Sequence, residues 1–124
     1  MLDHVSVAVR DLQRASAFYQ AVLGVLGYTK LETRSATIAF GKKYSEFWIN
    51  HRPRMTSVPD DSGTHVALRA STPEMVDAFH VAALANGGLS DGEPGVRPQH
   101  GEDYYSAFIR DPDGNKIEAV TFMR

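Results

Sequence analysis

The chain has 124 residues, a formal net charge of −2 and no cysteine. This length suits one domain with one hydrophobic core. The contents of 43% hydrophobic and 23% charged residues are typical of a globular protein. The lack of cysteine excludes a disulfide framework, a zinc ribbon and a thiol nucleophile, so any metal site needs His, Asp or Glu. The sequence has no run of Lys or Arg, so a nucleic-acid partner is not expected. No apolar run is long enough to span a membrane. No secretory signal is visible, so we expect a cytoplasmic protein.

The two halves of the chain resemble each other. At a constant offset of 61, seven of the 24 positions from His4 to Gly27 are identical to those from His65 to Gly88. The order of strand, helix and glycine is also the same in both halves. We interpret this pattern as an internal duplication. Two unrelated strand–helix units would also share some small and apolar residues, which is the plainer alternative.

Each half is predicted to begin with a strand, at residues 2–9 and 65–70, because apolar and other residues alternate there. The apolar set should pack on helices, so His4 and His65 should point to the opposite face. A helix follows each strand. Asp11 is the expected N-cap of the first helix, and Ser71 or Thr72 that of the second.

Further strands are expected after each helix, at residues 28–33, 36–40, 46–50, 104–110 and 116–122. The Asp-Pro-Asp-Gly sequence at residues 111–114 predicts a hairpin turn between the last two. Residues 51–63 are interpreted as a linker, and residues 89–103 as a long polar loop. The chain is therefore expected to be a single domain (1–124) of two modules, residues 1–56 and 64–124.

Glu118 lies in the middle of the last predicted strand, on one face with Lys116 and Val120. A carboxylate between apolar neighbours is costly to bury without a cation or hydrogen bonds. His4 and His65 occupy equivalent positions in the two copies of the repeat. With Glu118 they would suit a divalent first-row metal and leave open positions, as catalytic sites do. Two other interpretations remain: Glu118 pairs with Lys or Arg, and each histidine is an ordinary polar strand end.

Four segments resemble the vicinal oxygen chelate superfamily, which includes glyoxalase I, extradiol dioxygenases, fosfomycin-modifying enzymes and bleomycin-binding proteins. They are residues 2–7, residues 11–12 with 18–19, residues 63–67 and, most specifically, residues 111–118. The resemblance covers nearly the whole chain. It implies an α+β fold of two βαβββ modules that form a curled mixed sheet around a cavity, with the helices on the outer face.

In this family the first and last strands of each module supply the ligands of one divalent metal ion. By position these ligands fall on His4, His65 and Glu118, and Glu118 is the residue expected to act in catalysis. The metal could be Fe, Mn, Ni, Co or Zn.

The fourth ligand position of the family falls on Trp48, when residues 47–49 are aligned with residues 117–119. Indole offers only a donor N–H and cannot bind a metal. The set therefore looks more like the two histidines and one carboxylate of extradiol dioxygenases than like glyoxalase I. Glu46 lies on the same face and could replace Trp48 only with a shift of register.

Five side chains are expected to shape a substrate pocket, namely Trp48, Glu46, Arg97, His100 and Tyr105. Trp48 offers a flat apolar wall, and Arg97 could hold an anionic group. His100, Tyr105 and Glu46 are also candidates for a general base. The ordinary alternatives are that Tyr105 is a core residue and that Arg97 is solvated.

The resemblance implies a metal-dependent lyase, isomerase or dioxygenase that acts on a small, oxygen-rich organic molecule. The metal would chelate neighbouring oxygens of the substrate and stabilise developing negative charge. Two alternatives remain: a non-catalytic, antibiotic-type small-molecule binding protein, and a protein–protein module with a vestigial site. We also expect a homodimer, because dimers are frequent in the family and some build the cavity across the interface.

Overall fold

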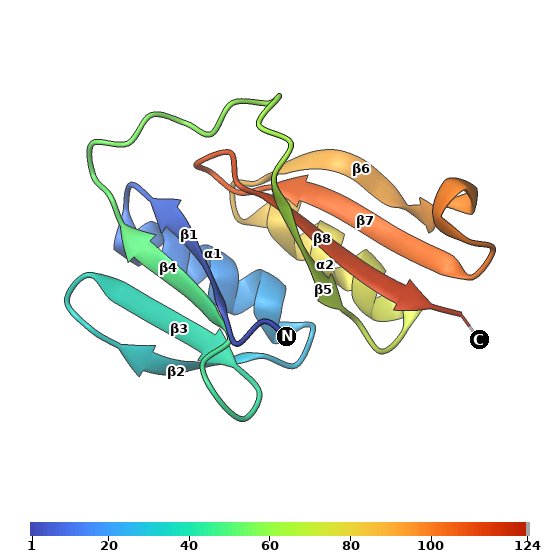
Figure 1. Cartoon of the computed structure of the whole chain (residues 1–124), viewed down its shortest axis with the longest axis horizontal. Helices are drawn as coiled ribbons and strands as arrows, with labels where there is room; N and C mark the ends of the chain where they lie inside the picture. Colours follow the sequence, from blue (N-terminus) through green and yellow to red (C-terminus); the bar gives the residue numbers. More distant parts are fainter. Residues whose placement is uncertain (124) are drawn as a thin grey trace.

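The computed structural model describes residues 1–123, which form two modules of the same design (Figure 1). Each module holds one helix and one four-stranded mixed sheet. Module 1 contains β1 (Val5–Val9), α1 (Leu12–Gly24), β2 (Thr29–Thr33), β3 (Thr37–Gly41) and β4 (Phe47–His51). Module 2 contains β5 (His65–Arg69), α2 (Pro73–Ala85), β6 (Leu89–Val96), a 3-10 turn (Pro98–His100), β7 (Tyr104–Arg110) and β8 (Lys116–Phe122).

The two sheets share one topology and one register. Their strand orders are β1-β4-β3-β2 and β5-β8-β7-β6, and the first strand of each module runs parallel to the last. Ser6 lies opposite Trp48 in module 1, and Ala67 lies opposite Glu118 in module 2. Trp48 and Glu118 therefore occupy equivalent positions, which confirms the alignment drawn from the sequence. Helices α1 and α2 also keep the offset of 61 at both ends, from 12 to 73 and from 24 to 85.

The helices cover one face of each sheet, and they lie behind the strands in Figure 1. Phe18 and Phe79, which correspond in the repeat, are almost fully buried in one hydrophobic cluster that includes residues of both modules. Burial of this apolar surface is the main stabilising contribution to the fold. The predicted α+β architecture of two βαβββ modules is confirmed. The sheets remain two separate four-stranded sheets that are not closed into one.

Both predicted helix starts are confirmed. The Asp11 side chain accepts a hydrogen bond from the Arg14 amide, and the Thr72 side chain accepts one from the Met75 amide. These bonds satisfy amides that have no partner within the helix. Pro73 occupies the first turn of α2, where the missing N–H costs nothing.

The prediction of a polar loop over residues 89–103 was wrong for residues 89–96. Residues 89–96 form β6, which pairs with β7 through register shifts around Gly92 and Gly95. β6 is the outer strand of its sheet, so Pro94 and the glycines are tolerated there. The Gly- and Pro-rich composition that suggested a loop is that of an irregular edge strand.

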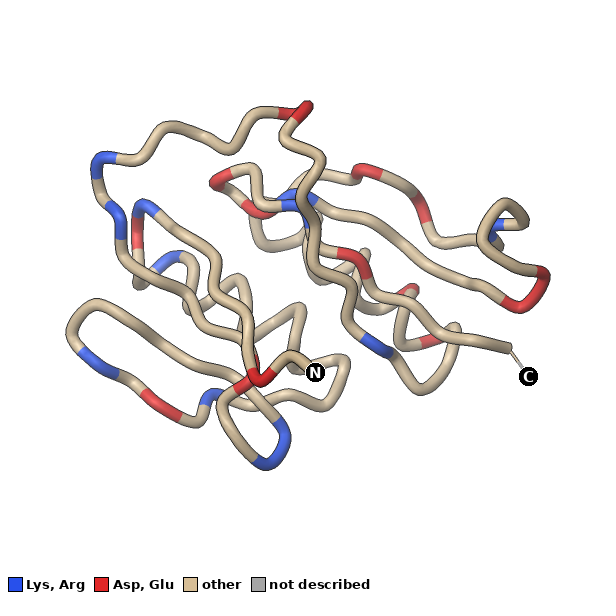
Figure 2. Tube along the Cα trace, viewed as in Figure 1, with Lys and Arg blue, Asp and Glu red and all other residues tan. Residues whose placement is uncertain are grey.

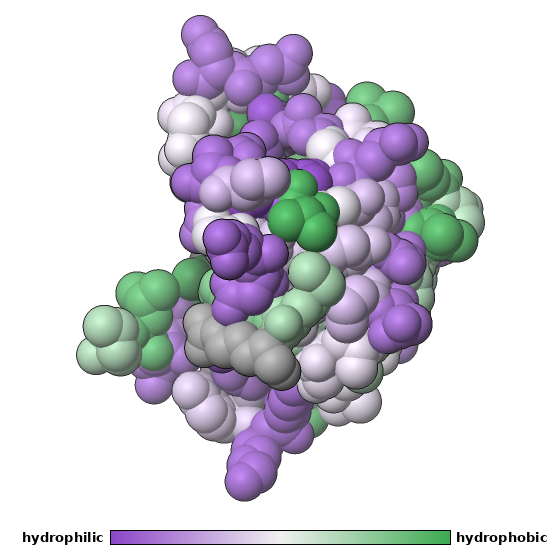
Figure 3. All heavy atoms as spheres, turned by 90° about the vertical axis from the view of Figure 1, so that its right-hand side faces the viewer, coloured by the Kyte–Doolittle hydropathy of each residue, from purple (hydrophilic) through white to green (hydrophobic). Residues whose placement is uncertain are grey.

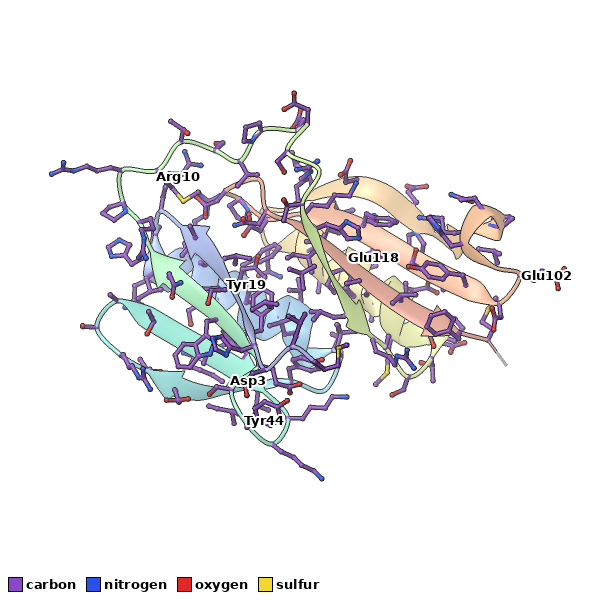
Figure 4. All side chains as sticks on the ribbon, in the orientation of Figure 1. Asp3, Arg10, Tyr19, Tyr44, Glu102 and Glu118 are labelled. Carbon is purple, nitrogen blue, oxygen red and sulfur yellow. The ribbon has the colours of Figure 1, made fainter. Side chains whose placement is uncertain are left out.

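The turn after β7 ties module 2 to module 1. The hydroxyl of Tyr19, on α1, donates to the buried carboxylate of Asp111 at 2.6 Å. Arg10 pairs with Asp113 at 2.8 Å, and the Asn115 amide donates to the Ala8 carbonyl at 2.9 Å. Burial raises the pKa of Asp111, and the hydrogen bonds from Tyr19 and Asn115 oppose that rise. Figure 4 labels Arg10 and Tyr19 on the module 1 side of this contact.

Neither one sign of charge nor apolar residues dominate the molecule in Figures 2 and 3. Basic and acidic residues are dispersed along the trace in Figure 2. The face seen in Figure 3 is mostly hydrophilic, with separate apolar patches. Within residues 1–123, no helix is long and apolar enough to cross a membrane.

We expect Tyr19→Phe to lower the free energy of unfolding by roughly 1–2 kcal/mol, because the buried Asp111 carboxylate loses one donor. Urea unfolding at pH 7 measures this loss. Tyr44→Phe is the control, since Tyr44 is exposed and its change should stay within about 0.5 kcal/mol. Equal stabilities of Tyr19→Phe and the wild type would contradict the role given to this contact.

Candidate functional site

The strongest candidate for a functional site is a histidine–carboxylate pair on the open face of module 2. His65 opens β5 and Glu118 lies in the middle of the adjacent β8. His65 pairs with Lys116, and Ala67 pairs with Glu118. The side chains of His65 and Glu118 therefore share the open face, which is the face of the sheet that turns away from the helices. His65 Nε2 lies 2.9 Å from Glu118 Oε1, and the Glu118 side chain is only 2% exposed. The strand alternation read from the sequence predicts this shared face.

Tyr104 completes the environment of Glu118, whereas the residues selected from the sequence for the pocket include its neighbour Tyr105. The Tyr104 hydroxyl donates to Glu118 Oε2 at 2.6 Å, so each carboxylate oxygen has a partner. Burial raises the pKa of Tyr104 to about 12, and the adjacent Glu118 carboxylate adds to the rise. Strand parity could have found this residue, because Tyr104, Ser106 and Phe108 share the open face once Arg110 is paired with Lys116.

Module 1 carries an apolar counterpart of this pair. His4 directly precedes β1, is half exposed, and has Nδ1 2.7 Å from the Asp3 carboxylate. The His4 ring meets Trp48 edge-on, with ring centroids 6.5 Å apart. The Arg34 guanidinium lies 4.9 Å from the centre of the Trp48 ring. Where module 2 has a carboxylate, module 1 has an aromatic wall with a cation beside it.

The three proposed metal ligands do not meet within one chain. Among residues 1–123, no group of three or more His, Asp or Glu side chains is placed to hold a metal ion. Figure 4 shows Asp3, the neighbour of His4, in module 1 and Glu118 in module 2, well separated in the view. A cavity of about 320 Å³ between the modules is lined by both histidines, but Glu118 does not line it.

Two of the other residues predicted for the pocket lie near these groups. Glu46 lines the same cavity, and its carboxylate accepts a hydrogen bond from the Lys42 amide at 3.2 Å. It precedes β4, so Trp48 keeps the position equivalent to Glu118. The exposed His100 ring lies against Tyr104, with centroids 5.1 Å apart. Arg97 lies beside Phe108, with its guanidinium carbon 5.6 Å from the centre of the ring.

The assignment of Tyr105 to the pocket is contradicted by the structure. Tyr105 has the opposite parity to Tyr104 and packs against the core. Its hydroxyl donates to Asp77, on α2, at 2.6 Å. Adjacent residues of a strand point to opposite faces, so only one of the two tyrosines can reach Glu118.

Comparison with known proteins identifies the family to which this chain belongs. The sequence model of the Glyoxalase/Bleomycin resistance protein/Dioxygenase superfamily matches residues 1–119. The paired modules define the fold class, and the chain belongs to this superfamily. Its members include enzymes such as lactoylglutathione lyase and commonly use a divalent metal.

Three similar proteins illustrate the range of the family. A virulence protein of Salmonella typhimurium is 31% identical, over 98% of this chain and 84% of its own length. A lactoylglutathione lyase of Arabidopsis thaliana is 30% identical over 94% of this chain, which spans only 42% of that enzyme. The crystal structure of a glyoxalase/bleomycin resistance protein from Albidiferax ferrireducens T118 is 36% identical, covers 97% of both chains and superposes with a TM-score of 0.84.

We expect Tyr104→Phe to destabilise the metal-free protein by about 1–3 kcal/mol, because one oxygen of the buried Glu118 loses its donor. Tyr105→Phe is a matched control on the next residue. Its partner Asp77 is exposed and can bond to water instead, so the change should stay within about 0.5 kcal/mol. Denaturant unfolding compares the two variants, and equal losses would argue against a special role for Tyr104.

Proposed function

We propose that this protein is a metal-dependent enzyme of its superfamily, a lyase, isomerase or dioxygenase acting on a small oxygen-rich molecule. The observation that carries the proposal is the nearly buried Glu118 carboxylate with His65 in contact on the open face of module 2. An ionised carboxylate is costly to bury, and a divalent cation held by the same two side chains would compensate that cost.

The chemistry of the donor set fits such a metal. Imidazole nitrogen and carboxylate oxygen are common ligands of divalent first-row metals. His65 and Glu118 would hold such a cation, and the Tyr104 hydroxyl, which donates to Glu118 Oε2, would keep the carboxylate in position. Hydrogen bonds of this kind orient a ligand and tune its basicity. Fe, Mn, Ni, Co and Zn all suit these donors.

We infer that His4 is supplied to this pair by a second copy of the chain, which makes the enzyme a homodimer. Two observations support this. No group of three ligands exists within residues 1–123 of one chain. The open faces of the two modules carry different pairs of side chains. Module 2 has His65 with Glu118, and module 1 has His4 with Trp48. A two-fold axis that places one half against the other would create two equal sites.

The bound metal would supply Lewis-acid stabilisation of negative charge on the substrate. Glu118 and His65 would hold it in place, Tyr104 would fix the orientation of Glu118, and Trp48 would provide a flat apolar wall opposite them. Trp48 stands where glyoxalase I carries a further ligand. This substitution favours a site with more open positions over the lactoylglutathione lyase reaction of the plant relatives.

A small-molecule binding protein without metal is the second candidate. It is favoured by the hydrogen bonding of Glu118, since His65 and Tyr104 already occupy both carboxylate oxygens. In that case the open face would bind its ligand through Trp48 and the surrounding polar groups.

The first test is the metal content of protein purified without an affinity tag. We expect a divalent metal to bind stoichiometrically, and His65→Ala or Glu118→Gln to weaken binding by about 10–100-fold or more. His51→Ala is the control, because His51 lies at the end of β4 and belongs to neither half-site. Substoichiometric metal under every supplementation, together with unchanged affinity in His65→Ala, would favour the binding protein.

The second test uses Trp48, the single tryptophan, as a reporter of the His4 half. Paramagnetic Co²⁺ should quench its fluorescence in the wild type, because His4 lies beside its ring. In His4→Ala the quenching should be lost or should need at least about tenfold more metal. Diamagnetic Zn²⁺ serves as the control ion. Equal quenching by Co²⁺ in both proteins would remove His4 from the ligand set.

A further inference from the structure

Phe108 is the centre of a positively charged cluster beside the proposed metal ligands. It lies opposite Glu118 in the β7–β8 ladder, on the open face of module 2. Lys116 Nζ is 4.8 Å from the centre of its ring, and the Arg97 guanidinium carbon is 5.6 Å away. The His65 ring meets Phe108 edge-on at 5.6 Å. The two cations are therefore arranged around a ring that also contacts His65.

The backbone of β6 holds the Arg97 side chain in place within this cluster. Its guanidinium donates to the carbonyls of Glu93 and Gly95, at 2.6 and 3.1 Å. A Cβ at Gly92 would come within 3.2 Å of the guanidinium, and one at Gly95 within 3.3 Å. The absence of side chains at these two positions of β6 leaves room for Arg97. Carbonyls position the guanidinium without neutralising it, and its other N–H donors remain available.

The charges around the cluster leave an excess of cations. Lys116 Nζ lies 3.1 Å from the Asp91 carboxylate, which is shared with Arg110 at 3.0 Å. Lys116 and Arg110 thus share one carboxylate, whereas Arg97 bonds to backbone carbonyls. The cluster therefore has three cations, and Asp91 and Glu118 are its two carboxylates. Glu118 is turned toward His65 and Tyr104. An anion placed over Phe108 would therefore meet uncompensated positive charge.

We propose that Arg97 and Lys116 form a subsite for an oxyanion group of the substrate, a carboxylate or a phosphate. The inference rests on the proposed function, since it places this group next to the metal-binding pair. Arg97 can bind two oxygens of a planar or tetrahedral oxyanion with parallel N–H groups, and Lys116 adds a point charge. Neighbouring oxygens of the same substrate would then lie against His65 and Glu118. The substrate is thus a small organic acid or a phosphorylated compound.

The test is a titration of the metal-free, full-length protein with sodium phosphate and, separately, with sodium oxalate at constant ionic strength. The amide signals of Phe108 and Lys116 in NMR spectra report binding. We expect saturable shifts with a Kd on the order of millimolar, weakened about tenfold in Arg97→Gln and in Lys116→Gln. Arg52→Gln changes an exposed cation of the linker and should bind like the wild type. The tighter of the two anions identifies the group.

Shifts that do not saturate, or equal affinities in Arg97→Gln, Lys116→Gln and Arg52→Gln, would overturn the subsite. The Lys116 variant keeps the test valid if the Arg97 variant does not fold. Metal titration of the same proteins separates this proposal from the proposed function. Arg97→Gln and Lys116→Gln should keep the metal affinity, and Glu118→Gln should lose metal but still bind the anion. Saturable anion binding in a protein that never binds metal would support the subsite and contradict the metal-dependent enzyme.

Discussion

The burial of one carboxylate constrains the whole of module 2. Glu118 lies between Ile117 and Ala119, both fully buried against the helix side, and its own side chain is almost inaccessible to water. Such a group needs partners, because removing a carboxylate from water costs several kcal/mol. His65 and Tyr104 come from the strands on either side of β8. The register of three strands is therefore coupled to one side chain, and a slip by one residue would turn Glu118 into the apolar core.

The duplication keeps this geometry and changes its chemistry. Trp48 occupies the position of Glu118 in an equivalent ladder, with Ser6 opposite it in place of Ala67. One half of the chain therefore offers a hydrogen-bonded carboxylate, and the other offers an aromatic wall. Two identical half-sites could form a symmetric centre, whereas two unlike halves would give the proposed site a metal-binding side and a substrate-contacting side. The cations around Phe108 lie on the module 2 side of the proposed site, where the proposed anion subsite would adjoin the metal-binding pair.

Much of this arrangement could be predicted from the sequence, because it depends on local periodicity. Alternation within strands placed His65 and Glu118 on one face, and the repeat aligned Trp48 with Glu118. β6 could not be recognised in the same way, since an edge strand tolerates the Gly and Pro residues that otherwise mark loops. The choice of Tyr105 over Tyr104 was wrong by one residue, which reverses the face. The separation of His4 from Glu118 depends on how the two modules pack, and no local pattern contains that information.

The proposed metal site combines His4 of one chain with His65 and Glu118 of another. Mixing the variants His4→Ala and Glu118→Gln and allowing the subunits to exchange tests it directly. Each variant alone has no intact site. In a mixed dimer, one site receives His4 from the Glu118→Gln chain and Glu118 from the His4→Ala chain. With random exchange we predict that tight metal binding returns to about a quarter of the wild-type capacity. No recovery on mixing, with both proteins folded and exchanging, would contradict the shared site.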